Sequence, residues 1–289
     1  MELQQMRYVL AVAETGNFTR AAAQCFVVQS ALSHQVKSLE RELGLTLFAR
    51  TSRRVELTSA GEAFLPAARA CLEAAERAVV EAAAAAGQVR GRLSIGVIPT
   101  VTALDVPDAL RRFRDAHPQV PVGLRVGSSR DFLREIREGV LDIALLGLPV
   151  TEPPRGVAHR ELRRSRHLAV VPSGHRLGRR RRLRLADLAE EVFADFPAES
   201  PGRAQSDLAF TAAGLQRQVA FEMTAVDHIL DLVDAGLAVA LLPPGTVPDR
   251  PGLRTVPVVD GPERIEHLAW SDFNPSPASS AFLRVLGFD

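Results

Sequence analysis

Apolar residues recur at three- and four-residue spacing through the first 58 positions, which predicts a series of short helices. The inner face of the first helix is formed by Leu3, Met6, Val9, Leu10 and Ala13. Gly16 and Asn17 end this helix, and Thr19 is a suitable N-cap for a second helix over residues 20–25.

A third helix is predicted over residues 30–43, with Gly44 as its C-terminal stop. Two short apolar stretches follow and flank a polar tip that carries Arg53 and Arg54. This pattern predicts a small hairpin, or wing. Short helices joined by a tight turn and followed by a wing make up a winged helix-turn-helix, which would end near residue 58.

A single long helix is predicted from residue 59 to about residue 88, because small apolar residues repeat there every three or four positions. Ser59 and Glu62 have the spacing of a capping box at its start. Small side chains along one face would let two such helices approach closely. Residues 59–90 are therefore interpreted as a linker and dimerisation helix.

Strand-like and helix-like segments alternate from residue 91 to residue 289, which favours a parallel α/β fold. The predicted strands lie near residues 93–98, 120–126, 142–147, 168–171, 192–196, 219–223 and 238–242. The predicted helices between them lie near residues 103–116, 131–138, 204–213 and 226–235. The chain is therefore an α/β multidomain protein.

The exposed side of the third predicted helix carries residue types that can bind DNA. Opposite the apolar face lie Ser33, His34 and Lys37, and Gln29 directly precedes the helix. Glutamine can pair with adenine, serine and histidine can bond base edges or phosphate, and lysine can neutralise phosphate. An ordinary helical hairpin with a solvated polar face fits the same pattern, so the residues alone leave both interpretations open.

The amino-acid composition excludes some classes of protein but does not identify the function. A chain of 289 residues with 46% hydrophobic and 24% charged residues is neither a disordered chain nor a disulfide scaffold. The formal net charge of +1 means that any surface that attracts nucleic acid must be local. Without a membrane-length apolar run or a secretory leader, the protein is expected to be soluble and cytoplasmic.

Five motifs between residues 18 and 61 strongly resemble those of the LysR-type transcriptional regulators. They are FTRAA, QSALSHQV, LERELG, LFAR and LTSAG, and moderately specific matches follow at residues 139–144 and 233–243. The resemblance covers essentially the whole chain. It implies a winged helix-turn-helix over residues 1–58, a linker helix over residues 59–90 and a two-lobed effector domain over residues 91–289. That domain would be similar to type 2 periplasmic binding proteins, with lobe I at about 91–162 and 265–289 and lobe II at about 163–264.

The resemblance also implies which residues meet DNA. The predicted set is Thr19, Arg20, Gln29, Ser30, Ser33, His34, Lys37, Arg53 and Arg54. Three positions depart from the family pattern: Val28 replaces a capping serine, Ser30 replaces a proline and His34 replaces an arginine. Ser30 could restore the helix cap one or two residues later. A mostly neutral imidazole at His34 predicts weaker and more pH-sensitive DNA binding than an arginine would give.

No nucleophile with a base, metal-ligand spacing or nucleotide-binding motif stands out, so no catalytic residue, metal or cofactor is expected. Hydroxyl residues that follow strands at helix starts suit a small anion or a carbonyl compound. The resemblance implies a ligand cleft lined by Thr100, Thr102, Ser128, Phe196 and Thr224. Plain helix caps without a ligand role are the alternative for the hydroxyl residues.

Two further features invite interpretation. Arg179 to Arg182 and Arg184 form a basic run, which is interpreted as a solvated loop rather than a nucleic-acid site. Cys25 and Cys71 are too few for a disulfide framework, and residues 92–289 lack the paired cysteines of the family's peroxide sensors. Cys25 could respond to oxidants only if it were exposed and had a lowered pKa.

The sequence therefore predicts a homodimeric or homotetrameric regulator that binds inverted repeats in double-stranded promoter DNA. Two recognition helices would enter major grooves about 10 base pairs apart. A small-molecule effector between the lobes would alter recruitment of RNA polymerase, and no membrane partner is expected. The alternatives are a thiol-responsive regulator acting through Cys25, a solute receptor that does not read DNA, and an enzyme that uses the α/β cleft.

Overall fold

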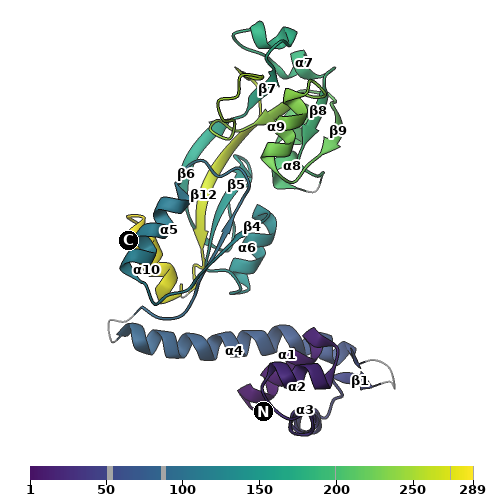
Figure 1. Ribbon diagram of the computed structural model, residues 1–289, viewed down its shortest axis with the longest axis vertical. Helices are drawn as coiled ribbons and strands as arrows, with labels where there is room; N and C mark the ends of the chain where they lie inside the picture. The colour runs from purple at the N-terminus through teal and green to yellow at the C-terminus, as the bar shows by residue number, and fades with distance from the viewer. Residues whose placement is uncertain (51–54, 86–88, 199, 274, 289) are drawn as a thin grey trace. The chain divides into compact units, whose positions relative to one another are not determined.

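The structure is a computed structural model that describes residues 1–50, 55–85, 89–198, 200–273 and 275–288 (Figure 1). The chain forms two compact units, Met1–Gln88 and Val89–Asp289, and each is described by itself. None of the helices in the described ranges has the length and hydropathy needed to span a membrane.

The first unit consists of four helices and a hairpin. They are α1 (Leu3–Thr15), α2 (Phe18–Gln24), α3 (Gln29–Leu43), β1 (Phe48–Arg50), β2 (Val55–Leu57) and α4 (Ser59–Ala85). The apolar faces of α1 and α3 meet α2 in one core, where Val9, Ala21 and Leu32 are fully buried. Leu3, which was predicted on the inner face of α1, is 41% exposed, because it lies at the first position of the helix. β1 and β2 pair antiparallel, which confirms the predicted hairpin, and Gly44 ends α3 with a φ of 67°.

Two predicted helix caps are wrong by one or two residues. Asn17 caps α2 in place of Thr19, because its side-chain oxygen accepts the N–H groups of Thr19 and Arg20 at 2.8 and 3.0 Å. At the start of α4, the Thr58 hydroxyl accepts the Gly61 N–H at 3.0 Å, where a capping box beginning at Ser59 was predicted. The cap is the last extended residue before the first turn, which a run of short polar residues locates only to within a residue or two.

The start of α3 also differs from the prediction. The helix begins at Gln29, and its N-cap Val28 makes no side-chain capping bond. Ser30 lies inside the first turn, so the prediction that it restores the cap is wrong. α3 therefore begins with first-turn N–H groups that no capping side chain satisfies.

The turn between α2 and α3 places an aromatic residue in a left-handed conformation. Phe26 has a φ of 55° and is 95% exposed. The Val27 N–H bonds to the Ala22 carbonyl and the Phe26 N–H bonds to the Ala23 carbonyl, the two bonds of a Schellman motif. Glycine normally takes this position, because a left-handed φ brings the Cβ of other residues close to the backbone.

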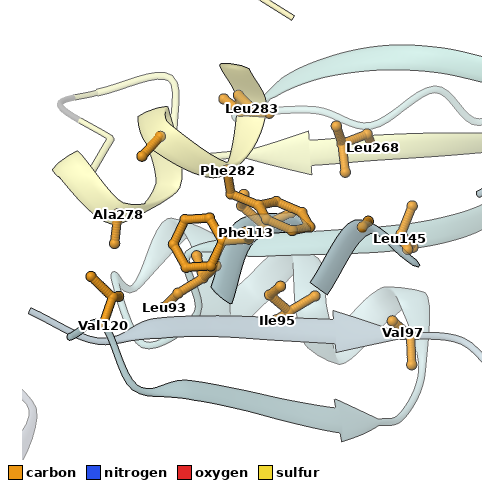
Figure 2. Packing of buried hydrophobic residues seen from close by; sticks show 13 residues of the cluster. Leu93, Ile95, Val97, Phe113, Val120, Leu145, Leu268, Ala278, Phe282 and Leu283 are labelled. Carbon is orange, nitrogen blue, oxygen red and sulfur yellow. The ribbon is translucent and has the colours of Figure 1, made fainter. Parts of the chain in front are cut away.

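Lobe I of the second unit is a five-stranded mixed sheet with three helices. Its strand order is β4 (Val122–Val126), β3 (Leu93–Val97), β5 (Ile143–Pro149), β12 (Glu263–Trp270) and β6 (Ala158–Arg166). The helices are α5 (Val106–Ala116), α6 (Ser129–Arg137) and α10 (Pro277–Val285). Phe113 of α5 and Phe282 of α10 meet edge to face at 5.5 Å over Leu93, Ile95 and Leu268 of the sheet (Figure 2).

Lobe II contains a three-stranded antiparallel sheet and a parallel strand pair. The sheet order is β10 (Ala240–Leu242), β7 (Leu168–Pro172) and β11 (Leu253–Pro257), and the pair is β8 (Val192–Asp195) with β9 (Gln218–Glu222). Its helices are η1 (Arg176–Arg179), α7 (Leu185–Leu188), α8 (Pro201–Ala212) and α9 (Val226–Asp234). The chain enters lobe II after β6 and returns to lobe I along β12 (Figure 1). The predicted lobe boundaries fall inside these two strands.

All seven predicted strands of the second unit are present, and β3, β4 and β5 and the pair β8–β9 run parallel as expected of a parallel α/β fold, but the other pairings are antiparallel. β12 runs antiparallel to both β5 and β6, and β7 pairs antiparallel with both neighbours. The sequence analysis missed β6, β11 and β12, as well as α10. β6 is an edge strand that is mostly exposed, and β12 buries Arg264, Glu266 and His267, so neither shows the expected alternation of apolar and polar residues.

We expect Phe26→Gly to stabilise the first unit. Removing the side chain relieves a left-handed strain of roughly 1–2 kcal/mol, offset by about 0.5–1 kcal/mol of extra chain entropy in the unfolded state. Urea unfolding of the full chain, followed through the single tyrosine, Tyr8, should show a higher midpoint. The matched control Gly44→Ala should lower it. If the urea midpoint of Phe26→Gly is at or below that of wild type, the conformation of Phe26 is not strained.

Candidate functional site

The predicted reading residues of α3 lie on one side of the helix. Gln29, Ser30, His34 and Lys37 are exposed and Ser33 is half-buried, whereas Leu32, Val36 and Leu39 face the core. Positions 29, 33 and 37 follow a four-residue spacing, which places them in one stripe along the helix. The stripe therefore offers amide, hydroxyl, imidazole and ammonium groups to a groove.

Of the other four residues predicted to contact DNA, the structure describes two. Thr19 and Arg20 are exposed in the first turn of α2, and an Arg20 nitrogen donates to the Thr15 carbonyl at 2.6 Å. This bond fixes the guanidinium at the corner between α1 and α2. Arg53 and Arg54 lie outside the described residues.

A cavity of about 340 Å³ lies between the two lobes of the second unit. Lobe I contributes the ends of β3, β4 and β5 and the start of α6, and lobe II contributes Phe196, Thr224 and the start of α8. The lining residues are Ile98, Pro99, Thr100, Val126, Gly127, Ser128, Ser129, Gly147, Phe196, Pro197, Ser200, Pro201, Gly202, Gln205, Thr224 and Arg264. Four of the five predicted ligand residues, Thr100, Ser128, Phe196 and Thr224, are among them.

Thr102, the fifth predicted ligand residue, lies outside the cavity lining. Its hydroxyl donates to Glu266 Oε1 at 2.5 Å and its N–H donates to Glu266 Oε2 at 2.8 Å. The Ala103 N–H also donates to Oε2, at 3.0 Å. Thr102 therefore holds the loop between β3 and α5 to β12.

Arg264 on β12 is a site residue that the sequence analysis missed. Its side chain is 2% exposed, lines the cavity and donates to the Thr100 hydroxyl and carbonyl at 2.6 and 2.7 Å. It also pairs with Glu266 at 2.8 Å. The sequence does carry a signal for it: Arg264 and Glu266 are opposite charges two positions apart, in a segment that also contains the apolar residues Ile265 and Leu268.

Gly147 of β5 is the point where the lobes meet at the cavity. Ser129 Oγ accepts the Gly147 N–H at 3.1 Å and donates to its carbonyl at 3.2 Å. Gln205 of α8 donates its side-chain amide to the same carbonyl at 3.1 Å. A Cβ on Gly147 would lie 2.7 Å from Ile98 Cδ1 and 3.1 Å from the Arg264 guanidinium, so a larger residue here would require these side chains to shift.

A buried ion pair supports the lobe II wall of the cavity. Arg217 lies over the rings of Phe193 and Phe210 and pairs with Asp195 at 2.7 Å. Burial raises the pKa of Asp195, and Arg217 opposes that shift. The Asp195 carboxylate accepts the N–H of Phe196 at 2.7 Å, which positions this aromatic residue at the cavity.

The structure also describes the arginine run and Cys25, the two remaining features of the sequence. The arginine run begins at the last residue of η1 and continues toward α7; its arginines are exposed, and Arg180 pairs with Asp187. Cys25 is half-buried against the core of the first unit, and burial raises the pKa of its thiol. This shift lowers the thiolate fraction, the opposite of what an oxidant sensor requires.

Two protein-family models match the chain. Residues 3–62 match the one described as bacterial regulatory helix-turn-helix protein, lysR family, and residues 86–287 match the LysR substrate binding domain. The chain belongs to the LysR family. It is a LysR-type DNA-binding transcriptional regulator with an effector-binding domain, which removes the receptor that does not read DNA from the alternatives.

Characterised LysR proteins are similar over the full length. The transcriptional regulator IlvR of Caulobacter vibrioides is 32% identical over 294 residues, which cover 100% of this chain and 98% of that protein. The Hca operon activator HcaR of Escherichia coli is 32% identical, with 99% and 97% covered. Full-length CbnR in complex with its target DNA has a TM-score of 0.71 and 26% identity over 99% of each chain.

We expect no peroxide response through Cys25. Because its thiol is half-buried and its pKa is raised, hydrogen peroxide should leave the DNA affinity of wild type and of Cys25→Ser equal. Fluorescence anisotropy with and without peroxide measures this. Cys71→Ser controls for oxidation of the exposed Cys71 on α4. A peroxide effect that Cys25→Ser alone abolishes contradicts the expectation.

His167, at the junction of β6 and β7, should make the second unit less stable in acid. Burial, together with the charges of Arg264 and Arg217, lowers the pKa of His167 from 6.5 to about 3. Between these values the unfolded chain binds the extra proton, so stability falls as pH falls below 6.5. From about pH 7.5 to about pH 5 this residue should remove roughly 2 kcal/mol.

Denaturant unfolding followed by the fluorescence of the single tryptophan, Trp270, measures this loss. His167→Gln should reduce the pH dependence even if it lowers stability at every pH. Equal pH slopes for the variant and wild type would show that His167 titrates normally in the folded state.

Proposed function

We propose that this LysR-type regulator reads inverted repeats in promoter DNA through the exposed stripe of α3 and is switched by a small molecule in the cavity between the lobes. Residues 1–58 would form the DNA-binding domain, 59–90 the linker and dimerisation helix, and 91–289 the effector domain. The observation that carries the proposal is the α3 stripe, with Gln29, His34 and Lys37 exposed opposite a fully apolar face.

The stripe suits a major groove because its side chains can bind different parts of the DNA, both base edges and phosphates. Gln29 in the first turn can pair with adenine through its amide, and Lys37 two turns later can neutralise a phosphate. His34 between them supplies a ring nitrogen instead of a fixed positive charge. Discrimination between DNA sequences therefore rests on Gln29. The electrostatic attraction to the phosphates comes from Lys37 and, we propose, from Arg53 and Arg54.

The cavity supports control by a ligand, because both lobes line it. A molecule that contacts Thr100 and Ser128 of lobe I together with Phe196 and Thr224 of lobe II prefers one lobe arrangement over another. In a dimer or tetramer paired through α4, that preference would change the spacing of the reading helices and the recruitment of RNA polymerase. The cavity residues bind and orient the molecule, and the protein is not an enzyme.

Capture of sheared genomic DNA by the purified full chain tests the reading head. We expect wild type to retain a sharp set of inverted-repeat sites and Gln29→Ala to lose them, because a bidentate base contact contributes about 1–3 kcal/mol of discrimination. Gln4→Ala, an exposed glutamine on α1, is the matched control and should retain the same sites. Specific sites retained equally by all three proteins would remove Gln29 from the interface.

The substitution His34→Arg tests the role of charge on the same stripe. We expect tighter binding to the captured sites and a salt dependence steeper by about one released ion, because arginine adds a fixed charge. Titrations by fluorescence anisotropy at several salt concentrations measure both quantities. Unchanged affinity and slope would place His34 away from the phosphates.

A further inference from the structure

The turn before α3 exposes two apolar side chains, Phe26 and Val28, directly beside the reading stripe. We propose that Val28 is a further specificity-determining residue, whose methyl groups contact the 5-methyl group of a thymine in the base pair next to the one that Gln29 reads. This inference rests on the proposed function, since it assigns a preferred base to the same reading helix.

The position of Val28 in the chain brings it to the groove together with Gln29. Val28 is the N-cap of α3, has an extended backbone with φ −75° and ψ 143°, and is 67% exposed. Gln29, the next residue, is exposed and opens the helix. The N-terminal residues of a recognition helix are the ones that contact base edges in the major groove. A valine next to a reading glutamine therefore lies within reach of the neighbouring base pair.

The apolar surface is a feature of the turn and not of one stray residue. Folded proteins commonly expose single apolar side chains, so the valine alone would need no explanation. Phe26, two positions earlier, is 95% exposed, whereas Val27 between them packs against the core of the first unit. The turn thus anchors itself through its middle residue and presents apolar groups on both sides of it.

Both exposed residues carry a cost in the free protein. Val28 makes no capping bond, whereas a serine, the usual residue of the family at this position, could accept a first-turn N–H. Phe26 has a φ of 55°, a conformation that favours glycine. Unfavourable local features of this kind are concentrated at functional sites, so the turn is a candidate contact surface.

The chemistry of the major groove identifies what the valine contacts. The 5-methyl group of thymine is the one apolar group among those that the base edges present there, and small apolar side chains make contact with it. Valine carries two methyl groups and neither donates nor accepts a hydrogen bond. A valine in the groove therefore distinguishes thymine from the other bases, while the Gln29 amide pairs with an adenine.

Continuity with the α3 stripe favours DNA over a second protein as the occupant. Gln29, His34 and Lys37 continue from Val28 along the exposed side of the helix, and all three are polar. A stable contact between proteins buries roughly 1,000 Å² or more, which two apolar side chains beside a polar stripe do not supply. A single methyl contact within a larger polar interface is what this arrangement fits.

Replacement of thymine by deoxyuridine tests the contact, because it removes the 5-methyl group and keeps the hydrogen bonds of the base pair. Duplexes that carry the sites captured by the wild-type full chain would have each thymine replaced in turn, and fluorescence anisotropy at constant salt would give their affinities. We expect one sensitive thymine in each half-site, where loss of the methyl group weakens binding about fourfold.

The substitutions Val28→Ser and Val28→Thr connect this preference to the residue. Both add a hydroxyl that can cap α3, so neither should unfold the first unit, and they differ from each other by one methyl group. Val28→Thr should keep most of the preference for thymine over uracil at the sensitive position, and Val28→Ser should lose it. Thymines at the other positions are the internal control, and urea unfolding followed through Tyr8 checks that both variants are folded.

Three outcomes overturn the inference: wild type that binds the thymine and uracil duplexes equally at every position, Val28→Ser that keeps the preference in full, or an equal loss in both variants, which would assign the effect to the added hydroxyl. If the duplexes bind equally and Val28→Ser changes the oligomeric state in sedimentation velocity, the turn contacts a second copy of the chain. Specific capture by wild type leaves the proposed function intact in all these cases, whereas a wild type that captures no specific site removes the proposed function and this inference with it.

Discussion

The end of the cavity that lobe I forms depends on a buried ion pair. Arg264 and Glu266 are each 2% exposed, and taking two charges out of water is costly unless good geometry and further hydrogen bonds satisfy both groups. Those bonds come from the segment between β3 and α5, where Thr100, Thr102 and Ala103 meet the pair. The pair thereby fixes the loop that forms one end of the cavity. The site is built around a charge that β12 carries into it.

The residues around Arg264 also connect the two lobes. The Gly147 carbonyl accepts bonds from Ser129 of lobe I and Gln205 of lobe II, and the glycine lets the Arg264 guanidinium approach the strand. Each lobe also begins a helix at the cavity. A bound molecule that satisfies groups on both sides interacts differently with different lobe arrangements, which is the physical requirement for control by a ligand.

In the first unit, α3 is packed on one side and exposed along the other. Leu32, Val36 and Leu39 bury one side of α3 completely, so the other side can carry polar residues that add little to stability. The turn before α3 holds Phe26 in a left-handed conformation, and Val28 begins the helix without a side-chain cap. Packing of the apolar face compensates for both features, because burial contributes more than a cap does.

By itself the sequence determined the order of the elements in the first unit, the buried face of α3, most of that of α1, and the seven most regular strands of the second unit. Four of the five predicted ligand residues line the cavity between the lobes. Local spacing is enough for the elements, because periodicity reports which side of a helix or strand is buried. The cavity residues came from the resemblance to the LysR family. Only the tertiary structure decided the antiparallel course of β12, the burial of Arg264 and the role of Thr102. A charge in a strand looks solvent-exposed in sequence, and its partners lie about 160 residues away, as in the Arg264–Thr100 bond with its separation of 164.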